Sequence, residues 1–175
     1  VSPKLNAENF VKIAENESLP FDLRAEAAHA LISVDEQKAT ALTKTLLAAA
    51  DSFQQSQLTS LFSQSKAGGL VLCTMVEDKV IQTDAFDISS AERIIQSHPG
   101  SLQAKEIIAS ARKRVAEQRK QAQERIHHLM SYISENPGDA EKGKVTFTTC
   151  LSCHQVGTVG QDVAPPLDGS GHRDL

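Results

Sequence analysis

The chain has 175 residues, of which 40% are hydrophobic and 23% charged, so it has enough apolar surface to form an ordinary globular core. A net charge of -4 gives no electrostatic case for nucleic acid as a partner. No stretch approaches the roughly 20 apolar residues needed to cross a bilayer, so we expect no transmembrane segment. Only 4% of the residues are aromatic and there is no Trp, which favours the packing of helices through small side chains.

Apolar residues recur at helical spacing through the first hundred residues and predict a series of short helices. We expect them at about 7–16, from Pro20 as a first-turn proline, and at 36–50, 53–62, 70–81 and 89–96. The segment 70–81 is apolar and short enough to be a strand instead. Gly68 and Gly69 are expected to interrupt the pattern, and Pro99 and Gly100 to close the last helix. The residues expected to face inward are Phe10, Val11, Ile13 and Ala14, then Leu23, Ala27, Leu31 and Val34, then Ala39, Leu42, Leu46 and Ala49.

From Ser101 to about Glu135 the helical pattern is unbroken and predicts one long amphipathic helix of about 50 Å. Asn136, Pro137 and Gly138 should end it and mark a domain boundary. We therefore expect a helical domain over residues 1–136 and a second domain over residues 137–175. The apolar face of the long helix consists of Ala104, Ile108, Ala111, Val115, Ala122, Ile126, Leu129 and Ile133.

The helix pairs resemble HEAT-like repeats over about residues 5–97, particularly at Pro20, Arg24, Ala27 and Leu31. The resemblance implies a stack of helix pairs in which each pair buries its apolar face against its neighbours. No strict repeat period can be measured, so an irregular helical bundle is an equal alternative. Both alternatives are all-α folds.

Three cysteines are present, and two of them belong to one short motif, which argues against a disulfide framework. Cys73 has apolar neighbours and is expected to be a small buried hydrophobe. The motif is Cys150-Leu151-Ser152-Cys153-His154, the Cys-x-x-Cys-His pattern of c-type haem attachment. On a helical turn this spacing directs both sulfurs to the same side, where they can form thioethers to one edge of a porphyrin. His154 is then held beneath the iron as the proximal axial ligand.

The residues around this motif resemble the class I cytochrome c family from Gly138 to Leu175. Gly138-Asp139-Ala140, Gly143 and Phe147 resemble the helix that precedes the haem attachment site in that family. Residues 163–169, Val-Ala-Pro-Pro-Leu-Asp-Gly, resemble the family's Gly-Pro-x-Leu segment, with Ala164 in place of glycine. The resemblance implies that the Pro165 carbonyl accepts the free N–H of His154, and that Phe147 and Leu167 line the haem pocket. Gly143 would allow close contact with another helix.

More narrowly, a helical segment followed by this cytochrome-like segment resembles the haem-binding C-terminal region of secreted dehydrogenase-like proteins of planctomycete-type bacteria. The matching residues after the motif are Val156, Gly157, Gly160, Asp162 and Val163. This resemblance implies a periplasmic or otherwise extracytoplasmic location and one-electron transfer from a dehydrogenase domain to a redox partner protein. Any such dehydrogenase lies outside this sequence, in which residues 1–136 carry no acid–base or substrate-binding motif.

Two features depart from the family pattern. The family's downstream Met ligand has no counterpart, because Met75 and Met130 both precede the motif, and His172 is the one downstream histidine that could be the sixth ligand. Residues 138–175 also correspond only to the front part of a cytochrome c domain, so the haem domain is expected to be truncated. Haem attachment requires export to the compartment of the maturation machinery, so a chain made in the cytoplasm is expected to carry a free dithiol.

The alternative function is a helical protein-interaction module whose tail is a spacer or a zinc-binding knuckle. Cys150, Cys153, His154 and His172 are suitable zinc ligands, although adjacent Cys153 and His154 converge on one metal only with strain. His127 and His128 on the long helix could approach a haem but are expected to face solvent or the margin of the apolar face. The basic residues of that helix are interleaved with acidic ones and indicate a solvated face, or a docking surface for an acidic redox partner: Arg112, Lys113, Arg114, Arg119, Lys120 and Arg125.

Overall fold

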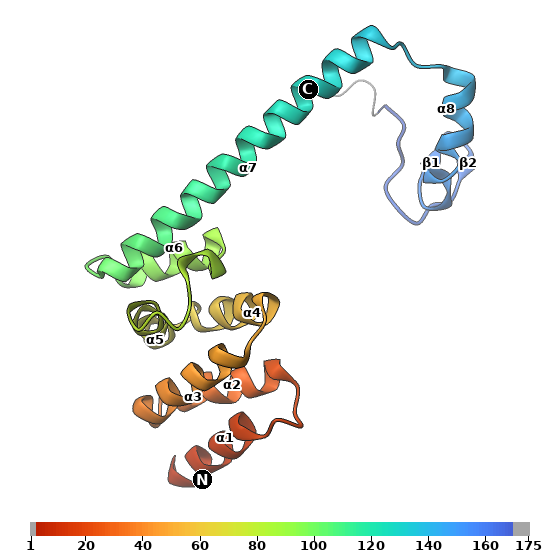
Figure 1. The fold of residues 1–175 in the computed structure, drawn as a ribbon. Helices are drawn as coiled ribbons and strands as arrows, with labels where there is room; N and C mark the ends of the chain where they lie inside the picture. The colour runs from red at the N-terminus through yellow and green to blue at the C-terminus, as the bar shows by residue number, and fades with distance from the viewer. Residues whose placement is uncertain (1–2, 170–175) are drawn as a thin grey trace. The chain divides into compact units, whose positions relative to one another are not determined.

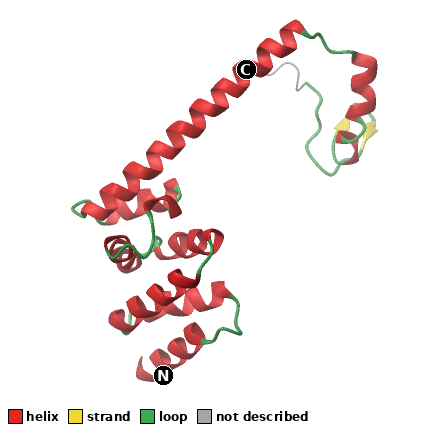
Figure 2. Ribbon diagram, viewed as in Figure 1, coloured by secondary structure: helices red, strands yellow, loops and turns green. Residues whose placement is uncertain are grey.

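The computed structural model describes residues 3–169 of the chain. Contacts within the chain divide it into two units, Val1–Gln121 and Ala122–Leu175. Within the described residues the secondary structure consists of eight α-helices, two 3₁₀ turns and one small antiparallel hairpin (Figure 2). The predicted all-α fold is confirmed.

The first unit begins with six helices joined by short connections. They are α1 (Pro3–Glu15), α2 (Phe21–Leu31), α3 (Glu36–Ala49), α4 (Ser52–Phe62), α5 (Lys66–Glu77) and α6 (Ile88–Ser97), with the 3₁₀ turn η1 (Thr83–Ala85) before α6. Four of these helices begin at a capping side chain, whose oxygen accepts a backbone N–H of the first turn. These caps are Asp35, Asp51, Ser65 and Asp87, and at α4 Gln54 completes a capping box with Asp51.

The helices of the first unit pack in chain order (Figure 1). The most extensive contacts join α1 to α2, α2 to α3 and α4, α4 to α5, and α5 to α6. The HEAT-like repeat stays a prediction. One apolar core runs through the unit, and its largest fully buried side chains include Leu31, Leu47, Leu58, Phe62, Leu72, Met75, Phe86, Ile94 and Ile107.

The inward face of α2 differs from the predicted one. Leu23 and Val34 are 42% and 41% exposed, whereas Ala25, Ala27, Ala28 and Leu31 are buried. Because small alanines form the contact face, the neighbouring helices approach closely there. Val34 lies beyond the end of the helix at Leu31, so it cannot continue the helical face. Ala49, predicted to be buried near the end of α3, is likewise exposed.

Gly68 and Gly69 were predicted to interrupt the helical pattern, but both lie within the first turn of α5. The prediction was wrong because Ser65 caps the helix just before them and accepts the N–H of Gly68 at 3.0 Å. A Cβ on Gly68 would lie 2.2 Å from the carbonyl oxygen of Phe62, so glycine lets α4 and α5 meet closely. The open choice between helix and strand for this segment resolves as helix, with Leu70 on the exposed side.

Helix α7 spans Leu102–Glu135 without a break, close to the predicted range. Its first turns bury Ala104, Ile107, Ile108 and Ala111 in the core of the first unit. Beyond Ala111 no described residue is buried, and the later members of the predicted apolar face, such as Ile126, are exposed. The helical spacing was therefore predicted correctly for the whole helix, but it leads to core packing only at its start.

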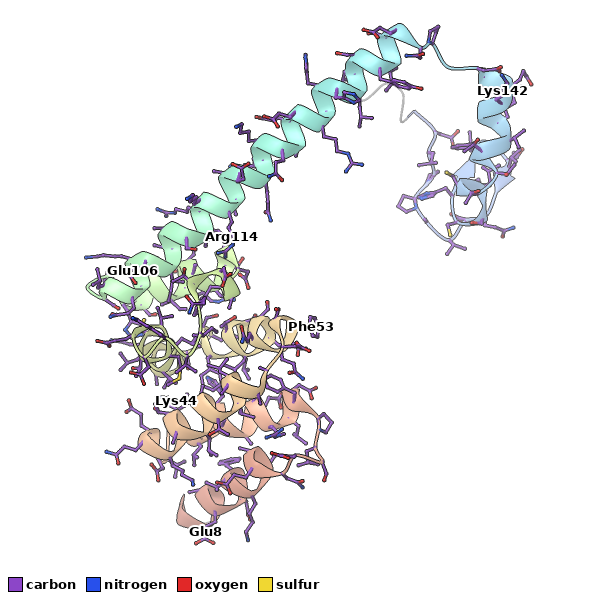
Figure 3. All side chains as sticks on the ribbon, in the orientation of Figure 1. Glu8, Lys44, Phe53, Glu106, Arg114 and Lys142 are labelled. Carbon is purple, nitrogen blue, oxygen red and sulfur yellow. The ribbon has the colours of Figure 1, made fainter. Side chains whose placement is uncertain are left out.

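Arg114 of α7 corrects the interpretation of the basic residues as one solvated face. Its guanidinium donates to the carbonyl oxygens of Thr83 and Phe86 and to the Ser110 hydroxyl. Figure 3 labels this side chain where α7 passes the segment before α6. Arg114 therefore ties the η1 segment to α7 and is half-buried.

The second unit contains the end of α7, then α8 (Ala140–Phe147), the 3₁₀ turn η2 (Cys150–Ser152) and the hairpin of β1 (Gln155–Val156) and β2 (Val159–Gly160). Asp139 caps α8 by accepting the N–H groups of Glu141 and Lys142. The hydrogen bond from the Lys142 backbone holds the pKa of Asp139 below its ordinary value, and the Lys142 ammonium, labelled in Figure 3, lies 3.2 Å from the same carboxylate. None of the described helices is both long and apolar enough to cross a membrane.

Candidate functional site

The predicted site is built on a tight turn that follows α8. The carbonyl oxygen of Cys150 accepts the N–H of Cys153 at 3.2 Å and that of His154 at 2.9 Å. These two bonds close one helical turn, so Cys150, Cys153 and His154 are held within one compact bend. Both cysteines are free and exposed. Their thiols are therefore accessible from solvent, as attachment to a large planar group requires.

His154 contacts Pro165, eleven residues further along the chain. Its Nδ1 lies 2.7 Å from the Pro165 carbonyl oxygen. A carbonyl oxygen can only accept, so Nδ1 must carry the hydrogen and donate it. In the neutral ring Nε2 then has the free lone pair, which is the form in which histidine binds a metal. The contact that the cytochrome c resemblance implies is thus present, and the roles of both residues toward a haem stay predictions.

A series of backbone hydrogen bonds holds the segment after the hairpin against the motif. Cys153 O accepts the N–H groups of Val163 at 3.2 Å and Ala164 at 2.8 Å. Gln155 O accepts the N–H of Leu167 at 2.9 Å. Further bonds join Gln161 N to Leu151 O at 3.0 Å and Gly157 N to the Asp168 carboxylate at 2.9 Å. The loop is consequently fixed to the residues on both sides of His154.

Two glycines allow this loop to form. Gly157 has φ +57 and is the first of the two residues between β1 and β2, the position at which a type II′ hairpin turn requires glycine. Gly160 has φ +105, and a Cβ there would lie 2.2 Å from the carbonyl oxygen of His154. A side chain at residue 160 cannot be accommodated while β2 runs this close to His154.

The apolar side chains around the motif are partly or largely exposed. Phe147 is 36% exposed at the end of α8, and Leu151 and Leu167 are half-buried. No residue from Ala122 to Gly169 is buried. These described residues have no hydrophobic core, and hydrogen bonds carry most of their internal order. A Cβ on Gly143 would meet nothing within 4 Å, so the close helix contact predicted there is not made within residues 3–169.

The remaining candidate residues lie apart from the turn or outside the described chain. His172, the predicted sixth ligand and fourth zinc ligand, lies outside the described residues. Among residues 3–169 no three His, Cys, Asp or Glu side chains are grouped so that they could hold a metal ion. His127 and His128 are exposed on α7. Cys73 is buried, as predicted, and burial raises the pKa of its thiol.

Asp168 is a residue of the site that was not predicted from the sequence. Asp168 belongs to residues 163–169, which resemble the Gly-Pro-x-Leu segment of the cytochrome c family, but that resemblance implies no role for it. The signal was the Asp-Gly pair after two prolines, since Asp side chains often bind a backbone N–H in turns. Gly169 does have φ +73, so the chain turns directly after Asp168.

Comparison of the chain with protein-family models, with curated proteins and with solved structures found no match.

Proposed function

We propose that this chain transfers single electrons through a c-type haem bound covalently by Cys150 and Cys153, with His154 as the proximal axial ligand. The observation that carries the proposal is the hydrogen bond from His154 Nδ1 to the Pro165 carbonyl at 2.7 Å. It leaves Nε2 of the neutral ring as a free ligand beside two exposed thiols in a Cys-x-x-Cys-His turn.

The residues of the turn have separate roles in this proposal. Each thiol would hold the porphyrin by adding across one of its vinyl groups: the sulfur would bond to one vinyl carbon and the thiol hydrogen would go to the other. The Pro165 carbonyl accepts a hydrogen bond from His154 Nδ1, which makes the ring more basic and would stabilise the oxidised state of a bound iron relative to its reduced state. When bound, the haem supplies the Fe(III)/Fe(II) couple that accepts and donates one electron.

The partly exposed apolar side chains near the turn could pack against a bound porphyrin. These side chains are the aromatic ring of Phe147 and the branched aliphatic side chains of Leu151 and Leu167. They belong to the second unit, whose described residues form no hydrophobic core. Covering such side chains is favourable by about 25 cal/mol for each Å² of apolar surface removed from water. Phe147 and Leu167 are accordingly the proposed walls of the haem pocket.

The proposed location is extracytoplasmic, where cysteine attachment by the maturation machinery takes place. The proposed electron donor is a dehydrogenase domain of the parent protein, and the acceptor is a separate redox partner protein. Nucleic acid has no place in this proposal, because a net charge of -4 does not attract a polyanion.

The test is to export the chain with the cytochrome maturation factors and to measure its absorbance and mass. We expect a Soret band, a c-type α band after pyridine treatment and the added mass of one haem. Cys150→Ser and Cys153→Ser should each reduce covalent attachment, and His154→Ala should change the spectrum of the iron. Cys73→Ala is the matched control, because the thiol of Cys73 is buried. A colourless exported chain with stoichiometric zinc would instead support the zinc-binding interaction module.

A further inference from the structure

The segment that carries the Pro165 carbonyl cannot hold itself in place with its own amides. Pro165 and Pro166 are consecutive prolines, and proline has no backbone N–H. The bonds that position this carbonyl must therefore come from residues before and after the pair. Ala164 provides one on the near side, by donating to the Cys153 carbonyl at 2.8 Å.

On the far side two bonds follow the prolines. Leu167 donates its N–H to the Gln155 carbonyl at 2.9 Å. The Asp168 carboxylate accepts the N–H of Gly157 at 2.9 Å, the one bond of this group in which a side chain takes part. Together with the His154–Pro165 contact, these bonds pair residues 154, 155 and 157 with residues 165, 167 and 168. The three pairs follow one another along both segments, so each bond limits the movement of the neighbouring pair.

We propose that Asp168 is a positioning residue for His154. Its carboxylate fastens the loop to the hairpin turn at Gly157, and this keeps the Pro165 carbonyl at hydrogen-bond distance from His154 Nδ1. Asp168 thus selects the tautomer of His154 from a distance, without touching the ring. The inference about the tautomer concerns the chain alone, and only its redox consequence rests on the proposed haem function.

Two features favour this role over that of a solvated surface carboxylate. Gly157 has φ +57 in a hairpin of only two residues on each strand, so the turn has few bonds of its own. Asp162 lies in the same loop and is also exposed, but within the described residues it makes no hydrogen bond. The chain therefore offers an internal comparison between Asp168, which is bonded to Gly157, and Asp162, which makes no hydrogen bond among residues 3–169.

The experiment uses the full chain without haem and three variants. Asp168→Ala removes the acceptor, Asp168→Asn keeps a side-chain oxygen in the same place, and Asp162→Ala is the matched control. Nitrogen-15 NMR of the imidazoles reports the tautomer of His154, and hydrogen exchange reports the Gly157 amide. In Asp168→Ala we expect a mixture of tautomers and about five- to tenfold faster exchange, the usual effect of losing one such hydrogen bond. Asp168→Asn and Asp162→Ala should behave like the wild type.

The haem-loaded chain gives an independent second reading. Loss of the hydrogen bond makes His154 less basic, so Asp168→Ala should have a higher reduction potential than the wild type, and Asp168→Asn should restore it. An unchanged tautomer and unchanged Gly157 exchange in Asp168→Ala would overturn the positioning role, whether or not haem binds. Failure of all variants and the wild type to bind haem would overturn the proposed function, while the measurements without haem would still decide the role of Asp168.

Discussion

Replacing Gly160 with alanine should open the loop that holds His154. The added Cβ would lie 2.2 Å from the His154 carbonyl oxygen, a separation that must grow beyond 3.0 Å. The oxygen belongs to the backbone and the Cβ is fixed rigidly to it, so the backbone itself has to move. Overpacking of this kind costs about 1–3 kcal/mol. A side chain held at φ +105 costs about 1–3 kcal/mol more. The closed loop should therefore be destabilised by about 2–6 kcal/mol in total, and the hairpin has no buried residue that could offset this cost.

Gly157→Ala is the matched control for this prediction. Gly157 also has positive φ, but a Cβ there would meet nothing within 4 Å, so only the conformational cost of about 1–2 kcal/mol applies. The excess cost in Gly160→Ala is therefore the contact with His154, about 1–3 kcal/mol, or roughly 5- to 150-fold in the population of the closed loop.

The assay compares both variants with the wild type in the full chain without haem. Hydrogen exchange of the Val163, Ala164 and Leu167 amides reports the closed loop, and the tautomer of His154 reports its contact with Pro165. We expect a small increase in exchange in Gly157→Ala and near loss of protection in Gly160→Ala. Equal behaviour of the two variants would refute the steric reasoning, because it would leave positive φ as the whole effect.

Three further predictions concern the helical unit, with unfolding in urea as the measurement. Gly68→Ala should lower the free energy of unfolding by up to about 2 kcal/mol, because the clash with the Phe62 carbonyl, about 1–3 kcal/mol, is set against a helix-propensity gain of about 1 kcal/mol. A Cβ on Gly69 would meet side chains rather than backbone, the His98 ring at 3.2 Å and the Ser97 hydroxyl at 3.6 Å, so Gly69→Ala should be neutral or stabilising. A more stable Gly68→Ala would contradict this account. Phe62→Ala should cost about 3–5 kcal/mol, whereas Phe53→Ala on the same helix, 71% exposed, should change stability by less than about 0.5 kcal/mol. Burial lowers the pKa of His29, so as the pH falls below about 6.5 the unfolded chain binds a proton that the folded chain resists. Stability should therefore fall in that range, and the fall should be smaller in His29→Gln; an identical pH dependence would show that another group is responsible.

The existence of the helices could be predicted from the sequence, because apolar spacing and capping residues act locally. Asp35, Asp51 and Asp87 each cap the helix that begins at the next residue, so these starts are encoded within a few positions. The buried faces were predicted less well, because they depend on what packs against each helix. Leu23 is more apolar than Ala25, yet Ala25 is buried and Leu23 is not, since close packing between neighbouring helices selects the small residue.

The same limit applies to the glycines and to the long helix. Considered alone, Gly68 predicts a break in the helix. Its actual role is to leave room for the Phe62 carbonyl oxygen, and sequence spacing does not reveal that contact. Ile126 and Ala104 belong to one continuous helical pattern, yet only Ala104 meets a core. Periodicity predicts which residues share a face of a helix and says nothing about whether another element covers that face.

At the candidate site the sequence predicted the chemistry better than the support that orients it. The Cys-x-x-Cys-His residues and the contact between His154 and Pro165 follow from the motif and its resemblance. The contributions of Gly160 and Asp168 depend on chain reversals that no local pattern contains. Gly160 approaches His154, six positions away, and Asp168 binds Gly157, eleven positions away.

The absence of buried residues in the described part of the second unit gives these hydrogen bonds their importance. Where no core restrains a loop, its conformation is set by the bonds that close it, and each bond is worth only about 1 kcal/mol. The six bonds that join this loop to the motif can still select one arrangement, because opening any one of them leaves the others to hold the ends together. His154 Nδ1 is therefore held against the Pro165 carbonyl before anything binds to the ring, and a ligand that binds through Nε2 does not have to meet the cost of ordering the ring. The orientation of His154 is in this sense a property of the loop from 155 to 168 rather than of the motif that contains it.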